Sequence, residues 1–155
     1  MLNGRTFFIV VRYAQEGTIR KQSDDLDAGP QPEETAEVPD PTWLTAVRAA
    51  QSKKALDIVV LDLREITSLT DHFVICTGTN TRQNQAIADE IHLQVKQKGE
   101  LPISLEGYEN AEWVLVDYGD FIVHIFLQKT RTYYDLERLW RHAKKVDVPP
   151  EFVAA

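Results

Sequence analysis

The stretch Trp113–Leu127 reads WVLVDYGDFIVHIFL and contains two apolar runs, Trp113–Asp117 and Asp120–Leu127, on either side of Tyr118-Gly119. Both runs are rich in β-branched and aromatic residues, which favour strands. A two-residue connection that contains glycine is typical of a tight turn between antiparallel strands. The sequence therefore predicts a β-hairpin here, and we expect the remaining elements to build a sheet around it.

More strands are expected upstream of this hairpin. Asp57–Leu63 (DIVVLDL) and His72–Gly78 (HFVICTG) are apolar, β-branched runs that are too short for typical helices. Leu101–Leu105 has the composition of a further short strand. Together with the hairpin, these segments predict a sheet of about five strands.

The clearest helical pattern covers Thr79–Gly99. Its apolar residues Ile87, Ile91 and Val95 recur every four positions and form one stripe, and Thr81 is placed to cap the first turn. A strand–helix–strand unit around this helix is expected to be right-handed, with its two strands close to parallel.

Two other helices complete the expected fold. One begins at Asp40-Pro41, where aspartate can cap and proline suits the first helical position, and extends to about Lys53. The other covers about Arg131–Lys144. Helices interspersed with strands, the last two antiparallel, predict an α/β (α+β) domain with a mixed, mostly five-stranded sheet flanked by helices.

The composition bounds the class of protein. The chain has 155 residues, of which 43% are apolar and 26% charged, as in one ordinary soluble domain. A formal net charge of −7 argues against bulk neutralisation of phosphates, so no direct DNA binding is expected. Cys76 is the only cysteine, which excludes an internal disulfide and favours a reducing cytoplasm. No apolar run approaches the ~20 residues of a membrane span.

The charge is distributed unevenly along the chain. Residues 1–40 carry 4 basic and 8 acidic side chains, a net of −4, whereas residues 41–155 carry 13 and 16, a net of −3. We therefore expect a disordered or loosely held leader over 1–40, a folded domain over 41–147 and a tail over 148–155. The apolar run Phe7–Val11 is too short for a secretory signal, and organelle targeting by the leader is a weaker alternative to a cytoplasmic location.

No segment has the pattern of an active site. Gly78 lies between a strand and a helix, where a phosphate could bind, but a dinucleotide fingerprint requires three glycines. Asp117 and Asp120 bracket the hairpin turn, where aspartate is common, and they need not converge as a two-metal site requires. Zinc-ligand spacing is absent among the four histidines His72, His92, His124 and His142. The sequence therefore predicts no catalytic residue, no metal site and no cofactor, and Cys76 is expected to be an inert core thiol.

The hairpin has aromatic or aliphatic residues on both of its faces. About three helices are too few to cover two such faces, so an exposed aromatic patch with acidic residues at its edge is expected. Such a patch is typical of protein recognition, and its acidic rim predicts a basic partner such as a ribosomal or chromatin protein. For each single residue, His124 included, packing in the core is the alternative.

Five segments of the chain form a pattern that matches a known family. They are Asp71–Thr81 (DHFVICTGTNT), Glu106-Gly107, Trp113–Asp120 (WVLVDYGD), Val123–Phe126 (VHIF) and Arg131–Trp140 (RTYYDLERLW). In this order and spacing they resemble the ribosomal silencing factor family, RsfS/Iojap, over about residues 42–140.

The resemblance implies a factor that is not an enzyme. Members of the family bind the large ribosomal subunit through its protein L-fourteen, block joining of the small subunit, and lower translation in starvation or stationary phase. The implied fold resembles nucleotidyltransferases without their catalytic carboxylates, and free members commonly form homodimers. The partner-binding residues that the resemblance implies are Trp113, Asp117, Tyr118 and Asp120, with Glu106 and His124 in less defined roles.

Two other functions stay open at this point. A large-subunit assembly factor, which the resemblance also implies for organelles, would use the same surface. A metal-dependent nucleotidyltransferase would require a nucleotide site near Gly78 and Asp117.

Overall fold

The computed structural model describes residues 39–150 of the chain. The expectations for most of the leader, for the segment Phe7–Val11 and for the last residues of the tail therefore lie outside the described residues. Within them, no helix is both long and apolar enough to cross a membrane.

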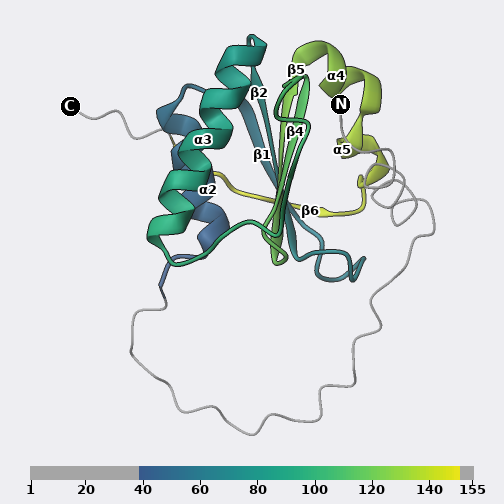
Figure 1. Cartoon of the computed structure of the whole chain (residues 1–155). Helices are drawn as coiled ribbons and strands as arrows, with labels where there is room; N and C mark the ends of the chain where they lie inside the picture. The colour runs from purple at the N-terminus through teal and green to yellow at the C-terminus, as the bar shows by residue number, and fades with distance from the viewer. Residues whose placement is uncertain (1–38, 151–155) are drawn as a thin grey trace, which may run out of the picture.

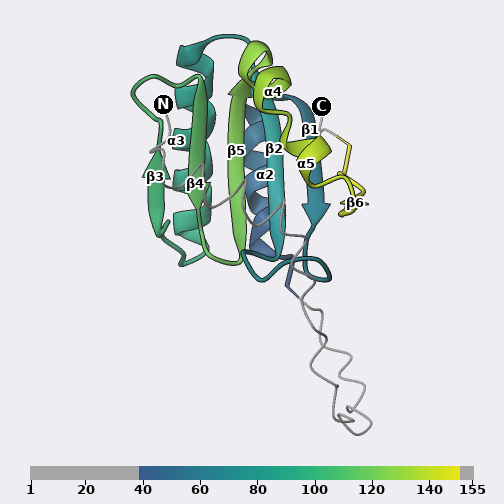
Figure 2. The same cartoon turned by 90° about the vertical axis from the view of Figure 1, so that its right-hand side faces the viewer.

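The described residues form one mixed sheet of six strands in the order β3-β4-β5-β2-β1-β6 (Figure 2). β2 and β5 pair in parallel at the centre, and all other neighbours are antiparallel. The mixed sheet is confirmed, but it has one strand more than expected. The strands are β1 (Leu56–Asp62), β2 (His72–Gly78), β3 (Ser104–Glu106), β4 (Trp113–Asp117), β5 (Phe121–Leu127) and β6 (Lys144–Val146).

The expected hairpin is present as β4 and β5, with Trp113 opposite Phe126. Its connection is one residue longer than expected, because β5 begins at Phe121. Gly119 has a φ of 85°, and its N–H donates to Asp117 Oδ1 at 2.7 Å. A left-handed conformation favours glycine at this turn, and the aspartate holds the turn through its side chain.

Helices lie on both sides of the sheet (Figure 1). α2 (Thr42–Ser52) and α3 (Thr81–Gln97) pack on one face, and α4 (Gln128–Tyr134) and α5 (Leu136–Leu139) lie on the other. The cap of α3 is one residue earlier than expected, because Asn80 Oδ1 accepts from the Gln83 N–H at 2.8 Å. At α2 the expected capping role of Asp40 is wrong, since no side chain caps this helix and Asp40 instead pairs with Arg48 at 3.1 Å.

The single helix expected over Arg131–Lys144 is wrong. Asp135 has a left-handed φ of 47° and ends α4, after which α5 makes only a short turn and the chain continues into β6. The break lets Leu136 and Trp140 point into the core, where Trp140 meets the Phe73 ring edge-on at a centroid distance of 5.4 Å. The helical periodicity of the sequence cannot reveal this break, because the break depends on the contact between Trp140 and Phe73.

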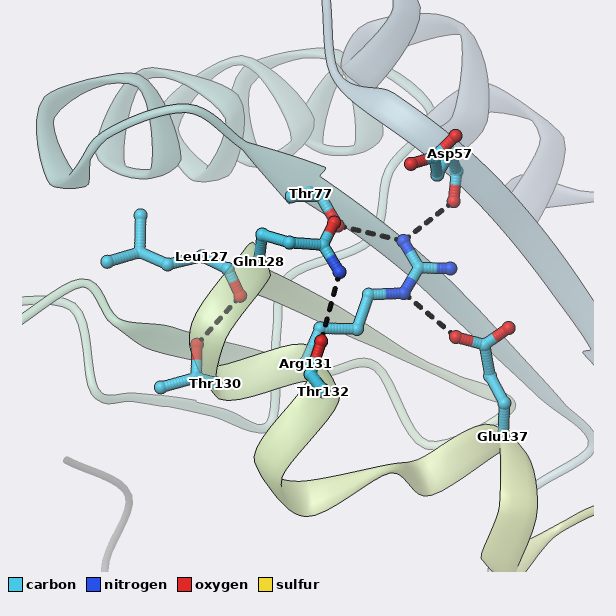
Figure 3. Close-up of polar contacts among 8 residues, drawn as sticks. All are labelled: Asp57, Thr77, Leu127, Gln128, Thr130, Arg131, Thr132 and Glu137. Atoms are coloured by element: carbon cyan, nitrogen blue, oxygen red, sulfur yellow. Dashed lines mark hydrogen bonds and ion pairs between the residues drawn. The ribbon is translucent and has the colours of Figure 1, made fainter.

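Buried Arg131 attaches α4 to the sheet (Figure 3). Its Nη1 donates to the Thr77 hydroxyl and to the Asp57 carbonyl, both at 2.8 Å, and its Nε donates to Glu137 Oε1 at 2.8 Å. Asp57 has a φ of 49° and lies where the register of β1 is irregular. The hydrogen bond from Arg131 to the Asp57 carbonyl therefore holds the irregular start of β1. One guanidinium therefore joins β1, β2, α4 and α5.

Each face of the sheet has its own apolar core. The side chains of β4 and β5 are buried on both faces, apart from the last residue of each strand, which is half-buried. The expected exposed patch on the hairpin is therefore wrong, because Tyr134 of α4, Leu136 of α5 and Trp140 just after α5 belong to the core on the second face.

Candidate partner-binding edge

Two of the expected partner-binding residues lie inside the second core. Trp113 is 4% exposed and His124 is fully buried. The Trp113 Nε1–H donates to His124 Nδ1 at 3.1 Å, and the indole packs against Tyr134 and Phe126 at centroid distances of 4.7 and 4.9 Å. Both side chains therefore pack inside the core on this face of the hairpin, and neither lies at the surface.

The buried His124 makes the fold sensitive to acid. Burial lowers the pKa of His124 from 6.5 to about 3. Between these two pH values, His124 is protonated in the unfolded chain but neutral in the folded chain. The stability that this group confers is complete above pH 6.5 and is lost as the pH falls toward 3, by up to ~1.4 kcal/mol per pH unit.

We predict that His124→Gln, which keeps an acceptor for the Trp113 indole, flattens this loss. The change in the free energy of unfolding with pH is measured by urea unfolding of both proteins at several pH values between 6.5 and 4.5. Equal pH slopes for the two proteins would contradict a neutral, buried His124.

The other expected residues surround the hairpin turn. Tyr118 is 7% exposed and stacks on Phe121 at a centroid distance of 4.8 Å, and burial raises its pKa to about 12. Asp117 is half-buried at the turn, and Asp120 is exposed beside it. Glu106 is half-buried on β3, opposite Leu115. Of the expected set, Asp117, Asp120 and Glu106 therefore reach the surface.

Beside the turn, the structure gathers apolar side chains that were not in the expected set. Four of the six exposed large apolar residues in the described part lie here, and they are Leu93, Leu101, Ile103 and Leu105. We call these four residues the apolar ridge. Ile103 is 72% exposed, its N–H donates to the Asp117 carbonyl at 2.7 Å, and its side chain reaches Gly119. The ridge therefore continues into the turn.

A groove of ≈430 Å³ runs along the ridge between α3 and β3. Its lining is mostly apolar and includes Leu93, Pro102, Leu105 and Val116. β3 pairs only with β4, so it forms one edge of the sheet. Exposed apolar surface along a sheet edge is characteristic of a binding site for another chain.

The same part of the chain is strongly acidic. Between Lys98 and Lys129 there is no lysine or arginine, and six carboxylates occur there: Glu100, Glu106, Glu109, Glu112, Asp117 and Asp120. Four of these side chains, those of residues 100, 106, 117 and 120, belong to β3, to the hairpin turn or to the segment leading into β3. The apolar ridge therefore has acidic residues along β3 and the hairpin turn, although Glu106 points to the opposite face of the sheet from Leu105 and Lys96 lines the groove on the α3 side.

An acidic cleft of ≈320 Å³ lies next to the ridge, at the end of the sheet. Trp43 and His72 stack across it at a centroid distance of 5.4 Å, and Asp71, Glu100 and Asp120 contribute carboxylates. The Thr42 hydroxyl donates to Glu100 Oε1 at 3.0 Å, which ties the start of α2 to the residue before the ridge. We call the ridge, its groove and this cleft the β3-edge surface.

Among residues 39–150, no cluster of histidine, cysteine and carboxylate side chains is placed to hold a metal ion. Cys76 is fully buried, and burial raises its pKa to about 12, as expected for an inert core thiol. Gly78 is required because a side chain there would collide with Asn84, whose amide donates to the Ala111 carbonyl at 2.7 Å.

The apolar ridge could have been found from the sequence by one signal. Leu101, Ile103 and Leu105 alternate in a short segment that holds an edge strand, and they are followed at once by Glu106. The alternation predicts one apolar face, but only the structure shows that α3 leaves that face uncovered. Fold and surface together describe a mixed α/β domain with an acidic and apolar edge suited to binding another macromolecule.

Comparison with known proteins identifies the family. The family model described as "Ribosomal silencing factor during starvation" matches residues 35–154. The Ribosomal silencing factor RsfS of Bacillus subtilis is 44% identical over 103 residues, which cover 66% of this chain and 87% of that protein. A crystal structure of protein CV0518 from Chromobacterium violaceum superposes with a TM-score of 0.64 and 35% identity, covering 73% of this chain and 93% of that one.

A more distant relative carries a different name. The mouse protein "Mitochondrial assembly of ribosomal large subunit protein 1" is 32% identical over 97 residues, 61% of this chain and 42% of that protein. The chain belongs to the ribosomal silencing factor family.

Proposed function

We propose that this protein represses translation by binding the large ribosomal subunit through its protein L-fourteen and blocking the approach of the small subunit. The repression would act in starvation or stationary phase, in the cytoplasm, and without catalysis. The free protein would form a homodimer. Family membership supports the ribosome as the partner, and the β3-edge surface supports a basic protein as the point of contact.

The observation that carries this proposal is the apolar ridge with the acidic residues along β3 and the hairpin turn. Leu101, Ile103 and Leu105 are 65%, 72% and 47% exposed, which suits the apolar centre of an interface. Glu106, Asp117 and Asp120 suit its rim, where charges guide the approach of a basic partner. Ribosomal proteins bind RNA and are rich in lysine and arginine, so an acidic rim selects them over the surrounding RNA.

The proposed mechanism is steric. The free energy of binding keeps the factor on a docking face of the large subunit, and the small subunit cannot occupy the same volume. No bond is made or broken. Repression then depends only on the fraction of large subunits that are covered, which affinity and concentration determine.

A second function has one observation in its favour. The mouse relative is named for assembly of the ribosomal large subunit, and an assembly factor could use the same β3-edge surface. Joining of purified mature subunits in the presence of the factor separates the two functions. A silencer inhibits joining at concentrations that saturate the large subunit, whereas a factor that acts only during maturation leaves joining unchanged.

We predict that Ile103→Ser and Leu105→Ser each weaken binding to the large subunit by about tenfold or more. Removing a buried aliphatic side chain from an interface loses ~1.5–3 kcal/mol, and tenfold in affinity is ~1.4 kcal/mol. Co-sedimentation with purified large subunits at several factor concentrations measures the change.

Leu56→Ser is the matched control for this experiment. Leu56 is 47% exposed, as is Leu105, and it also lies on a strand, but on β1 and far from the ridge in the strand order. We expect its binding to equal that of the unmodified protein. Unchanged binding of both ridge variants, with the folds intact, would reject the β3-edge surface as the contact.

A further inference from the structure

The opposite edge of the sheet has the opposite charge. Residues 138–145 read RLWRHAKK and contain four basic side chains and no acidic one, in a chain whose net charge is −7. Arg138, Arg141, Lys144 and Lys145 are all exposed. We call these four residues the basic edge.

The fold places the four cations of the basic edge on neighbouring segments, from α5 to β6. α5 and β6 lie next to each other beside β1, at the far side of the sheet from β3 (Figure 2). Arg141 Nη1 donates to the Arg138 carbonyl at 3.4 Å, so its guanidinium folds back over α5. Lys144 and Lys145 pair with Asp62 and Leu61, and successive strand residues point to opposite faces. The two lysines therefore flank β6 on both sides.

Carboxylates also occur near the basic edge, but two of them pair with other cations: Glu137 with Arg131 and Asp62 with Arg64, each at 2.8 Å. Asp135 and Asp147 are exposed and flank the basic edge in the sequence. Lys144 Nζ lies 3.5 Å from Glu65 Oε2, but these side chains are 70% and 64% exposed, so the pair contributes little. Within residues 39–150, Arg138, Arg141 and Lys145 form no ion pair. The basic edge can therefore receive an external anion without first breaking a strong internal contact.

We propose that the basic edge binds the phosphate backbone of ribosomal RNA while the β3-edge surface binds protein. This proposal rests on the proposed association with the large subunit, because that association makes RNA the abundant polyanion nearby. Lysine and arginine contacts to phosphates position a protein on RNA without reading its sequence. The inferred role is to fix the orientation of the factor on the subunit.

The chemistry of α5 and β6 favours RNA over an acidic protein. Protein interfaces require apolar or aromatic anchors at their centre. The large apolar residues of α5 and the turn after it pack against the core: Leu136 is 2% and Trp140 is 3% exposed, and Leu139 is half-buried. What remains on the outside is charge, which suffices for phosphate contacts.

The overall acidity of the protein does not oppose this contact. The outer strands β3 and β6 are separated by five strand spacings of ~4.8 Å, or about 24 Å. Exposed charges are largely screened beyond a Debye length of ~8 Å at physiological salt. The basic edge therefore acts on RNA almost independently of the acidic edge, and the two edges can engage different molecules at once.

The test neutralises the basic edge with four substitutions, Arg138→Gln, Arg141→Gln, Lys144→Gln and Lys145→Gln. Each lysine or arginine that contacts a phosphate adds ~0.7–0.9 to the slope of log affinity against log salt. We expect the slope for binding to purified large-subunit RNA, measured by fluorescence anisotropy from 50 to 300 mM salt, to fall by about 3. At 150 mM salt, affinity for the RNA should fall at least tenfold.

The control variant carries the same change in net charge elsewhere. Arg48, Lys53, Arg82 and Lys98 are also two arginines and two lysines, all exposed, on or next to α2 and α3. Replacing these four by glutamine should leave the RNA slope close to that of the unmodified protein. Thermal unfolding of both variants establishes that the folds are intact.

A separate measurement distinguishes failure of this proposal from failure of the proposed function. Binding to purified protein L-fourteen should be unchanged by neutralising the basic edge, and absence of that binding in the unmodified protein would reject only the L-fourteen contact. An unchanged RNA slope in the neutralised variant would overturn the RNA proposal. The lysines would then serve only to block pairing at an open sheet edge. Loss of subunit binding with an unchanged RNA slope would also overturn it, in favour of an acidic protein.

Discussion

Replacing Arg131 by methionine is expected to lower the free energy of unfolding by ~3–5 kcal/mol. Arg131 is 9% exposed, and three of its N–H groups donate to Asp57, Thr77 and Glu137 at 2.8 Å each (Figure 3). Removing one partner of a buried, hydrogen-bonded ion pair typically costs this much. The groups that remain are shielded from water and no longer have a partner that compensates their charge. Methionine keeps most of the volume, so the loss reports polar contacts rather than a cavity.

Urea denaturation followed by circular dichroism measures this effect, with Arg138→Met as the matched control. Arg138 follows Arg131 in the same region of the chain but is exposed, so its replacement should change stability by less than ~0.5 kcal/mol. Glu137→Gln keeps an acceptor for Arg131 and should fall between the two. If Arg131→Met and Arg138→Met are equally stable, the guanidinium does not hold α4 and α5 on the sheet.

The elements that follow from local pattern were predictable from the sequence. β2 has the expected bounds, His72–Gly78, because its short length, its β-branched residues and the glycine at its end all favour a strand. The hairpin and α3 were also expected, and their boundaries differ by one or two residues. The strand that follows α3 is β3, and the pairing directions make β3 run parallel to β2, as expected for a strand–helix–strand unit around α3.

The elements that depend on distant contacts were not predictable in the same way. The break at Asp135 and the strand β6 arise because Trp140 must reach Phe73, and β6 must pair with β1. A helical pattern over Arg131–Lys144 carries no trace of either contact. The burial of the hairpin side chains likewise depends on where α4 and α5 pack against the sheet. The sequence alone therefore could not show which of the expected site residues are exposed.

The net charge of −7 conceals a separation of charge across the sheet. Six carboxylates without a cation occur between Lys98 and Lys129, and four cations without a carboxylate occur between residues 138 and 145. The strand order places β3 and β6 at opposite edges, which turns neighbouring segments of sequence into opposite surfaces. A factor that sits on a particle of RNA and protein can use both signs of charge, each toward a different component.

Trp113 is buried in the core, and it is also one of the expected partner-binding residues. Two substitutions separate its contribution to stability from its contribution to ribosome binding. Trp113→Ala is expected to lower the free energy of unfolding by ~3–5 kcal/mol, because a 4% exposed indole leaves a large cavity. The variant also leaves His124 Nδ1 without its donor. Loss of ribosome binding by this variant would therefore not identify Trp113 as a contact.

Trp113→Phe keeps an aromatic ring against Phe126 and Tyr134 and removes only the indole N–H and some area. We expect it to lose ~1–2 kcal/mol of stability and to bind large subunits as tightly as the unmodified protein when fully folded. Urea unfolding and co-sedimentation at the same temperature give both quantities. A folded Trp113→Phe variant that binds at least tenfold more weakly would show that the indole contacts the partner directly. In that case the second face of the hairpin, as well as the β3 edge, must open to the ribosome.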